Sequence, residues 1–284
     1  MNKTLLSIGH GFSARALGHR LLADGWRVIG TTRSEEKAAQ LQKEGIEAII
    51  WPGQDLPFRD ASHVLSSVAP GDGGDPFLNS EGKALARAKH LEWVGYLSTT
   101  GVYGDHGGDW VDEDTPLFPN TKRGKARVAA EAAWQDLGLP VHIFRLAGIY
   151  GPGRGPFAKI RSGAARRIIK ENQVFSRIHV DDIGAVLAAS IARPNPGAVY
   201  NVCDDDPAPP QDVIAYAAKL LGAEIPEAVP FETANLSPMA RSFYADSKRV
   251  RNTRIKVELG VTLQYPDYKS TLTQMLQSEV EQDP

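Results

Sequence analysis

Two glycines near the N-terminus stand in the pattern with the clearest chemistry. The run Gly9-His10-Gly11-Phe12-Ser13-Ala14 has the form G-x-G-x-x-A and follows the apolar residues Leu5–Ile8. Glycine at these places permits a tight turn and a close approach of the backbone to a pyrophosphate, which then meets the N–H groups at the start of a helix. Helical spacing of Leu17 and Leu21 after the run indicates that helix. The pattern predicts a dinucleotide site, with a plain tight turn as the alternative.

The end of the next apolar segment indicates which dinucleotide is bound. An acidic residue about 20 positions past the glycines would hold the ribose 2′-OH of NAD. This sequence has Thr31-Thr32-Arg33 there, and its first acid is Glu35. An arginine can pair with a 2′-phosphate, whereas a carboxylate repels it. Thr32 and Arg33 therefore favour NADP(H) over NAD(H); the alternative is that Arg33 is a solvated residue at a helix start.

The elements that must position these residues alternate along the chain. Short apolar runs predict strands over residues 5–8, 27–30, 48–51, 63–66, 93–97, 142–146 and 199–202. Helical patterns between them cover residues 14–24, a segment that begins at Ser34, residues 127–137 and residues 181–192. This alternation predicts an α/β fold with a Rossmann-type, doubly wound parallel sheet.

The same pattern suggests a division of the chain. Residues 1–204 are expected to form the NAD(P)-binding Rossmann domain, with residues 151–177 as a substrate-side insertion. The Pro-rich stretch Asp206–Pro210 then marks a border. Residues 205–284 are expected to form a smaller, mainly helical C-terminal portion on the substrate side.

Composition narrows the class of protein. With 42% hydrophobic and 23% charged residues among 284, the chain is typical of a folded globular protein. Thirty-two basic against 34 acidic residues give a net charge of −2, which argues against nucleic-acid or membrane partners. The single cysteine, Cys203, and the scattered histidines predict neither an internal disulfide nor a metal site. Because the segment Met1–Ile8 is too short for a signal peptide, a cytoplasmic protein is expected.

Four later motifs carry a resemblance to a known family. Ser98–Asp105 (STTGVYGD) and Arg145–Gly153 (RLAGIYGPG) resemble the fifth- and sixth-strand motifs of extended short-chain dehydrogenases/reductases, the NAD-dependent epimerase/dehydratase group. Ile178–Ile183 and Tyr200–Val202 resemble its later landmarks. The resemblance covers residues 1–205 and implies an NAD(P)-dependent oxidoreductase. It also implies cofactor contacts from Ser98 and from Val68-Ala69-Pro70 at the end of the fourth strand.

The resemblance implies catalysis by Ser/Thr, Tyr and Lys around the nicotinamide, and here the sequence departs from the family. Thr99 takes the Ser/Thr position. Alignment on Gly124 and on Ala130-Glu131 places Arg123 where the tyrosine belongs and Arg127 where the lysine belongs. Arginine side chains ordinarily have a pKa above about 12 and cannot exchange protons, but they can bind phosphate or polarise a carbonyl. The alternative is that both are ordinary helix-surface bases.

A shifted register does not restore the missing group. It would place Thr121 and Lys125 at the two positions, and no tyrosine stands between Tyr103 and Tyr150. Tyr103 and His106, which follow the fifth strand, are then the candidates for a replacement acid or base. The alternative is that Tyr103 packs in the core and His106 is a solvated loop residue.

A basic segment suggests the charge of the substrate. Between residues 154 and 170 there are six bases and no acid: Arg154, Lys159, Arg161, Arg166, Arg167 and Lys170. This composition suits an anionic small molecule, and a solvated helix face is the alternative.

Two functions follow from these observations. The first is an NAD(P)-dependent oxidoreductase or epimerase that transfers a hydride on a phosphorylated or nucleotide-linked substrate without the usual Tyr-x-x-x-Lys pair. The second is a non-catalytic NADP(H)-binding redox sensor or partner-binding protein. Many relatives in the resembled family dimerise, so a homodimer is also expected.

Overall fold

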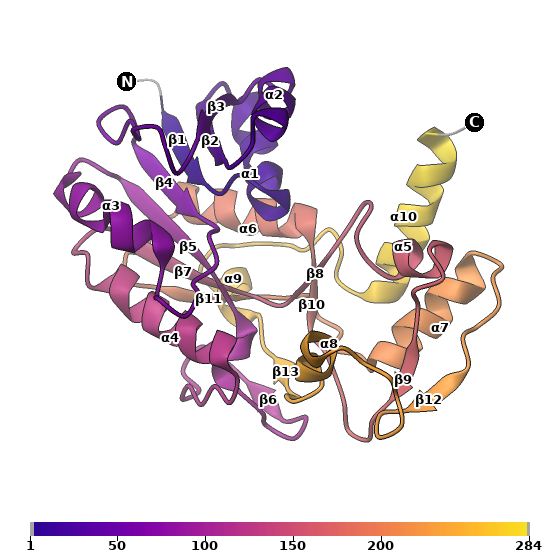
Figure 1. The fold of residues 1–284 in the computed structure, drawn as a ribbon. Coiled ribbons are helices and arrows are strands. Elements are labelled where there is room, and N and C mark those ends of the chain that lie inside the picture. The colour runs from indigo at the N-terminus through magenta and orange to yellow at the C-terminus, as the bar shows by residue number, and fades with distance from the viewer. Residues whose placement is uncertain (1–2, 283–284) are drawn as a thin grey trace.

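A seven-stranded sheet forms the centre of the molecule, in the computed structural model that describes residues 3–282 (Figure 1). Met1 and Asn2, part of the segment weighed above as a signal peptide, lie outside the described residues. The strand order is β11-β7-β5-β4-β1-β2-β3, and every neighbouring pair is parallel. The strands are β1 (Thr4–Ile8), β2 (Arg27–Thr32), β3 (Glu47–Ile50), β4 (His63–Ser66), β5 (Trp93–Thr99), β7 (Val141–Leu146) and β11 (Val199–Val202). The predicted Rossmann-type parallel sheet is confirmed.

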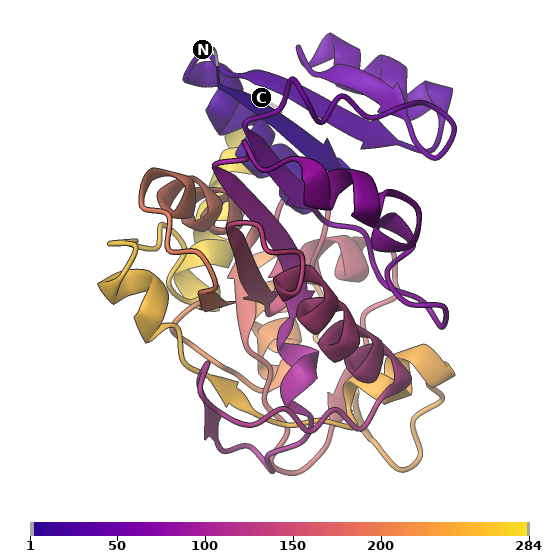
Figure 2. The ribbon, with the colours of Figure 1, turned by 90° about the vertical axis from the view of Figure 1, so that its left-hand side faces the viewer.

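Helices cover both faces of this sheet (Figures 1 and 2). Helices α1 (Phe12–Ala23), α2 (Glu35–Lys43) and α6 (Val180–Ala192) contribute to the apolar core on one face. Helices α3 (Pro76–Arg87) and α4 (Lys122–Gln135) contribute to the core on the other. Helix α4 begins five residues before the predicted start at residue 127, because the Thr121 hydroxyl caps it by accepting the N–H of Gly124.

The strand order changes direction between β1 and β4. Chain crossovers run from β1 outward to β2 and β3 on one side, and from β4 outward to β5, β7 and β11 on the other. In open parallel sheets the crevice at such a reversal, beyond the carboxyl ends of the strands, is where ligands bind. The glycine loop after β1 and the segment after β4 both lie at this place.

A second group of elements follows the sixth strand of the sheet. It contains β8 (Gly148–Tyr150), α5 (Pro156–Arg161), β9 (Arg167–Ile169), β10 (Arg177–His179), α7 (Pro210–Leu220), β12 (Ala228–Pro230), α8 (Pro238–Phe243) and α10 (Tyr268–Gln282). Tyr150, Phe157, Val213 and Leu272 share one apolar cluster that joins α5, α7 and α10. Figure 1 shows these three helices beside one another, at a distance from the glycine-loop end of the sheet.

The last part of the chain does not stay in this second group. Strand β13 (Arg249–Val250) pairs with β6 (Trp110–Val111), which follows the 3₁₀ turn η1 (Thr100–Tyr103). Ile255 of α9 (Thr253–Val257) is buried in the core of the main sheet. The domain division near residue 204 therefore stays a prediction. None of the helices between residues 3 and 282 is both long and apolar enough to span a membrane.

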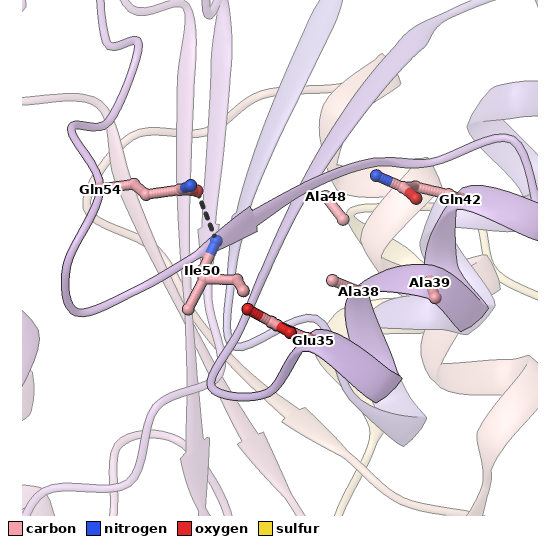
Figure 3. A pocket seen from close by; sticks show the side chains of 7 residues that line it. All are labelled: Glu35, Ala38, Ala39, Gln42, Ala48, Ile50 and Gln54. Carbon is pink, nitrogen blue, oxygen red and sulfur yellow. Dashed lines mark hydrogen bonds between the residues drawn. The ribbon is translucent and has the colours of Figure 1, made fainter.

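A hollow of about 280 Å³ lies between α2 and β3, the edge strand next to β2 (Figure 3). Its walls come from α2 and β3, among them Glu35, Ala38 and Ala48. The Gln54 side chain closes one side of it by accepting the N–H of Ile50 at 2.9 Å. Because none of the predicted site residues lines this hollow, we do not assign the site to it.

Candidate functional site

The glycine loop has the shape that a pyrophosphate needs. Gly9 adopts a φ of +74°, which a residue with a side chain rarely adopts, and its N–H donates to Thr31 Oγ1 at 2.8 Å. Gly11 is the N-cap residue of helix α1, and no side chain among the described residues caps that helix. A Cβ built on Gly11 would meet a single atom within 4 Å, the carbonyl oxygen of Gly9 at 3.8 Å. Phe12 and Ser13 at this uncapped helix start are partly exposed, whereas Ala14 is buried. The start of α1 therefore fits the pyrophosphate of a dinucleotide.

The ring of His10, within the glycine loop, packs between α1 and β2. The sequence analysis did not predict this role. Its side chain is buried, and neither ring nitrogen has a hydrogen-bond partner in residues 3–282. A Cβ on Gly18 would lie 2.8 Å from the ring, and one on Gly30 would lie 2.9 Å from it. Burial, with Arg15 nearby, lowers the pKa of His10 to about 4, so the ring is neutral near pH 7. His10 is thus a packing residue that α1 and β2 accommodate with glycines.

Arg33, which the sequence suggested for the 2′-phosphate of NADP, lies between β2 and α2. It follows Thr32 at the end of β2, and Ser34 then caps α2 by accepting the N–H of Lys37 at 3.4 Å. The Arg33 side chain is exposed and makes no ion pair or hydrogen bond with the residues the structure describes. Its guanidinium is consequently available to a phosphate at the carboxyl edge of the sheet.

The segment after β4 and the start of α4 meet at the glycine loop. Val68 lies against Gly9, since a Cβ there would be 3.2 Å from Val68 Cγ2. Arg127 Nη1 donates to the Leu97 carbonyl and to Tyr96 Oη, both at 2.8 Å, and lies 3.5 Å from the Val68 carbonyl. The structure thereby brings Arg127 and the Val68–Pro70 segment, for which cofactor contacts were expected, together. Nε and Nη2 of Arg127 have no acceptor within residues 3–282 and can donate to a ligand.

Thr99 is the last residue of β5, and Arg123 lies in the first turn of α4. Thr99 Oγ1 accepts the N–H of Gly101 at 3.2 Å and so caps η1, while its own O–H has no acceptor in the described chain. Arg123 lies one turn before Arg127 on the same side of α4. Its guanidinium lies 5.8 Å from the ring of Phe243, in α8. Arg123 therefore links the carboxyl edge of the sheet to the second group of elements.

Two predicted site hydroxyls point into the core instead. Tyr103 Oη donates to Asn201 Oδ1 at 2.7 Å and accepts from Arg145 Nη1 at 3.0 Å. Ser98 Oγ donates to Glu131 Oε1 at 2.5 Å, and Glu131 forms a buried ion pair with Arg145 at 2.8 Å. Burial raises the pKa of Tyr103 to about 12. This geometry favours a structural role for Tyr103 and Ser98.

The loop that carries His106 is fixed to the C-terminal part of the chain. The N–H groups of His106 and Gly108 both donate to the Ser247 carbonyl at 3.0 Å, and Lys248 Nζ donates to the Gly104 carbonyl at 2.7 Å. The His106 ring is half-buried, with Nε2 at 3.2 Å from the Tyr103 carbonyl oxygen. Its proton is therefore directed to the backbone rather than toward Thr99.

Four of the six bases of the basic segment have separate neighbours. Arg161 pairs with Glu279 at 2.5 Å, and Arg166 Nη1 donates to the Gly163 carbonyl at 3.0 Å. Lys170 donates to the carbonyl of Tyr244, whereas Arg154 lies over the ring of Phe12. Within residues 3–282 no group of three or more His, Cys, Asp or Glu side chains could hold a metal ion.

The sheet order, the glycine loop and the later motifs resemble those of the NAD-dependent epimerase/dehydratase group of extended short-chain dehydrogenases/reductases, and solved structures of that group are among the structural neighbours of the chain. A solved Methylobacillus flagellatus structure described as an NAD-dependent epimerase/dehydratase is 28% identical, with a TM-score of 0.74 over 98% of this chain and 99% of that one. The human epimerase family protein SDR39U1, solved with NADPH, is 19% identical, with a TM-score of 0.76 over 96% and 99%. The resemblance stated from the sequence is confirmed.

Among particular relatives, the chain belongs to the same family as a conserved protein of unknown function from Silicibacter pomeroyi DSS. That structure is 58% identical, with a TM-score of 0.95 over 98% of this chain and 99% of that one. Protein YeeZ of Escherichia coli K12 is 28% identical and covers 93% of this chain and 97% of its own. The 3-diazoavenalumate denitrifying reductase of a Streptomyces species is 28% identical over 57% of this chain and 58% of its own. No family model matches the sequence.

Proposed function

We propose that this protein binds NADP(H) and is an oxidoreductase or epimerase that acts on an anionic small molecule. The observation that carries the proposal is the uncapped start of α1, which lies at the reversal of strand order and follows a glycine with a φ of +74°. The relative named as a reductase supports an oxidoreductase, and one structure with the same fold, the human epimerase family protein, was solved with NADPH. Arg33, which follows β2, is exposed and has no ion pair or hydrogen bond within residues 3–282; this supports the phosphorylated cofactor.

Each residue of the site then has a defined task. The N–H groups of Phe12, Ser13 and Ala14 bind the pyrophosphate, and Arg33 pairs with the 2′-phosphate. The bound nicotinamide supplies or accepts a hydride at its C4. Arg127, held by the Leu97 carbonyl and Tyr96 Oη, donates its remaining N–H groups toward the ribose hydroxyls.

On the substrate side of the site, a hydroxyl and a guanidinium take the place of the family's Tyr/Lys pair, so charge and hydrogen bonds act there instead of proton transfer. Thr99 has an O–H available to hydrogen-bond a substrate oxygen. Arg123, at the position of the family tyrosine, stabilises negative charge that develops on that oxygen. Because an arginine does not release its proton near neutral pH, the proton that accompanies a carbonyl reduction comes from solvent or from the substrate.

Calorimetric titration of the purified protein with NADPH, NADP⁺, NADH and NAD⁺ tests the proposal. We expect NADPH to bind about 10- to 100-fold more tightly than NADH, because charge-assisted hydrogen bonds to the 2′-phosphate contribute about 1.5–3 kcal/mol. Arg33→Ala removes this preference and leaves NADH binding unchanged. Arg87→Ala is the matched control, because Arg87 is likewise exposed but lies at the far end of α3.

Three results would count against the proposal. Equal loss of NADPH and NADH affinity in Arg33→Ala would remove the role of Arg33. A preference of the unaltered protein for NADH would overturn the choice of cofactor. Binding of none of the four nucleotides would mean that the fold has lost its cofactor.

A second candidate is a protein that binds NADP(H) without catalysis. The observation that favours it is the engagement of the Tyr103 hydroxyl by Asn201 and Arg145, which directs this hydroxyl into the core. Transfer of deuterium from C4-labelled NADPH to any member of a panel of anionic aldehydes and ketones would exclude this candidate. The homodimer expected from the sequence stays a prediction, to be measured by sedimentation.

A further inference from the structure

The guanidinium of an exposed arginine, Arg154, lies over the ring of Phe12, the first residue of helix α1. The Arg154 guanidinium carbon is 5.4 Å from the centre of the Phe12 ring, and Phe12 is the residue that opens the helix after the glycine loop. The side chain of Arg154 forms no ion pair or hydrogen bond within residues 3–282. Its charge is therefore uncompensated at a place where the helix already attracts anions.

A tight turn fixes this arrangement. Gly151 and Arg154 exchange two backbone hydrogen bonds, N–H to carbonyl in each direction, both 2.9 Å long. Gly153 between them has a φ of +69°, which suits the third position of a turn that begins Gly-Pro-Gly. A Cβ on Gly151 would lie 3.4 Å from Phe12 Cζ and 2.7 Å from Val180 Cγ1, so the turn rests directly on α1 and α6. The backbone of Arg154 is thus held against the helix start while its guanidinium is left open.

Two other arginines of the segment do not share this setting. Arg161 also lies over a phenylalanine, Phe157, at 5.7 Å, but Glu279 neutralises it. Arg166 donates to the carbonyls of its own turn. Arg154 alone among these three arginines combines contact with the glycine loop and an unsatisfied guanidinium.

We propose that Arg154 is a positioning residue that pairs with the cofactor pyrophosphate, opposite the N–H groups of α1. The inference rests on the proposed NADP(H) site and assigns to it a cationic contact from the turn that follows β8. A planar guanidinium suits this task because it can donate two parallel hydrogen bonds to phosphate oxygens. Since the turn also begins the segment that leads into α5, cofactor binding would fix the start of the substrate-side elements.

Binding of three probes to matched variants separates this role from others. NADPH and NADH both carry a pyrophosphate, whereas 2′-AMP carries only the 2′-phosphate. Arg154→Ala and Arg154→Gln are expected to weaken both dinucleotides by about 10- to 100-fold, without changing their ratio or the affinity for 2′-AMP. Arg33→Ala is expected to give the opposite pattern, with weaker NADPH and 2′-AMP and unchanged NADH. Arg161→Ala, which also removes an arginine from a phenylalanine ring, should change none of the three.

The outcomes are distinct from those of the cofactor proposal. If the unaltered protein binds both dinucleotides and Arg154→Gln binds them equally well, the role of Arg154 is refuted and the site itself stands. Equal weakening of 2′-AMP by Arg154→Gln would refute it as well, because the effect would not depend on the pyrophosphate. Failure of the unaltered protein to bind either dinucleotide would overturn both proposals. Thermal melting of each variant shows that the fold is intact, which we expect because the Arg154 side chain is exposed.

Discussion

Replacement of Tyr103 by phenylalanine distinguishes a structural tyrosine from a catalytic one. The change removes one hydroxyl that donates to Asn201 at 2.7 Å and accepts from Arg145 at 3.0 Å, and leaves the ring in place. A neutral hydrogen bond contributes about 1 kcal/mol and one to a charged group about 1.5–3 kcal/mol. We therefore expect Tyr103→Phe to lower the free energy of unfolding by about 2–4 kcal/mol.

Urea denaturation followed by tryptophan fluorescence measures this loss. Tyr216→Phe is the matched control, because its half-buried hydroxyl makes a single bond to Thr273 at 3.2 Å, and its loss should cost less than about 1 kcal/mol. NADPH affinity should be the same in Tyr103→Phe and in the unaltered protein, since the hydroxyl points into the core. A Tyr103→Phe protein that is fully stable but has lost hydride transfer would refute the structural assignment and make Tyr103 the missing acid.

Two further predictions concern the glycine loop. Burial lowers the pKa of His10 from 6.5 to about 4, so the stability that its neutral ring provides is complete above pH 6.5 and is lost as the pH falls toward 4, by up to about 3 kcal/mol. Urea unfolding at pH 7.5 and 4.5 should show this loss, and His10→Leu should reduce it; an equal fall in both proteins would contradict the assignment. Gly11→Ala should leave the free energy of unfolding nearly unchanged, because its Cβ would approach no atom closer than 3.8 Å, yet weaken NADPH at least about ten-fold by obstructing the pyrophosphate. Unchanged NADPH affinity in Gly11→Ala would place the cofactor elsewhere.

The sequence was sufficient for the sheet and for the loop because both depend on local patterns. Each predicted strand is a short apolar run, and a strand buried on both faces requires such a run. The glycine loop was found because its chemistry needs particular residues at fixed spacing. The start of α4 was placed too late, since its first turn, Lys122–Lys125, carries charged residues and a glycine and shows no apolar stripe.

The assignments that depended on distant partners could not be made from spacing. Tyr103 and Asn201 are 98 residues apart, and Ser98 and Glu131 are 33 residues apart, yet each pair forms a buried hydrogen bond. The sequence showed polar residues at the end of a strand, which is where catalytic groups occur, but not which of them had partners in the core. Arg154 illustrates the reverse case. A Gly-Pro-Gly run is typical of a turn. The contact of the Arg154 guanidinium with the Phe12 ring could not be predicted, because the two residues are 142 positions apart.

The two arginines on α4 narrow the chemistry that the site can perform. Arg127 Nη1 is bound to the Leu97 carbonyl and Tyr96 Oη, so the guanidinium is fixed beside the glycine loop rather than mobile in solvent. Arg123 lies one turn earlier in α4, and its guanidinium is near the ring of Phe243 in the second group of elements. A Tyr/Lys pair at these positions would exchange a proton, whereas two guanidinium groups offer only charge and hydrogen bonds. The site is therefore suited to a substrate that already carries negative charge, or develops it during hydride transfer, and that obtains its proton from elsewhere.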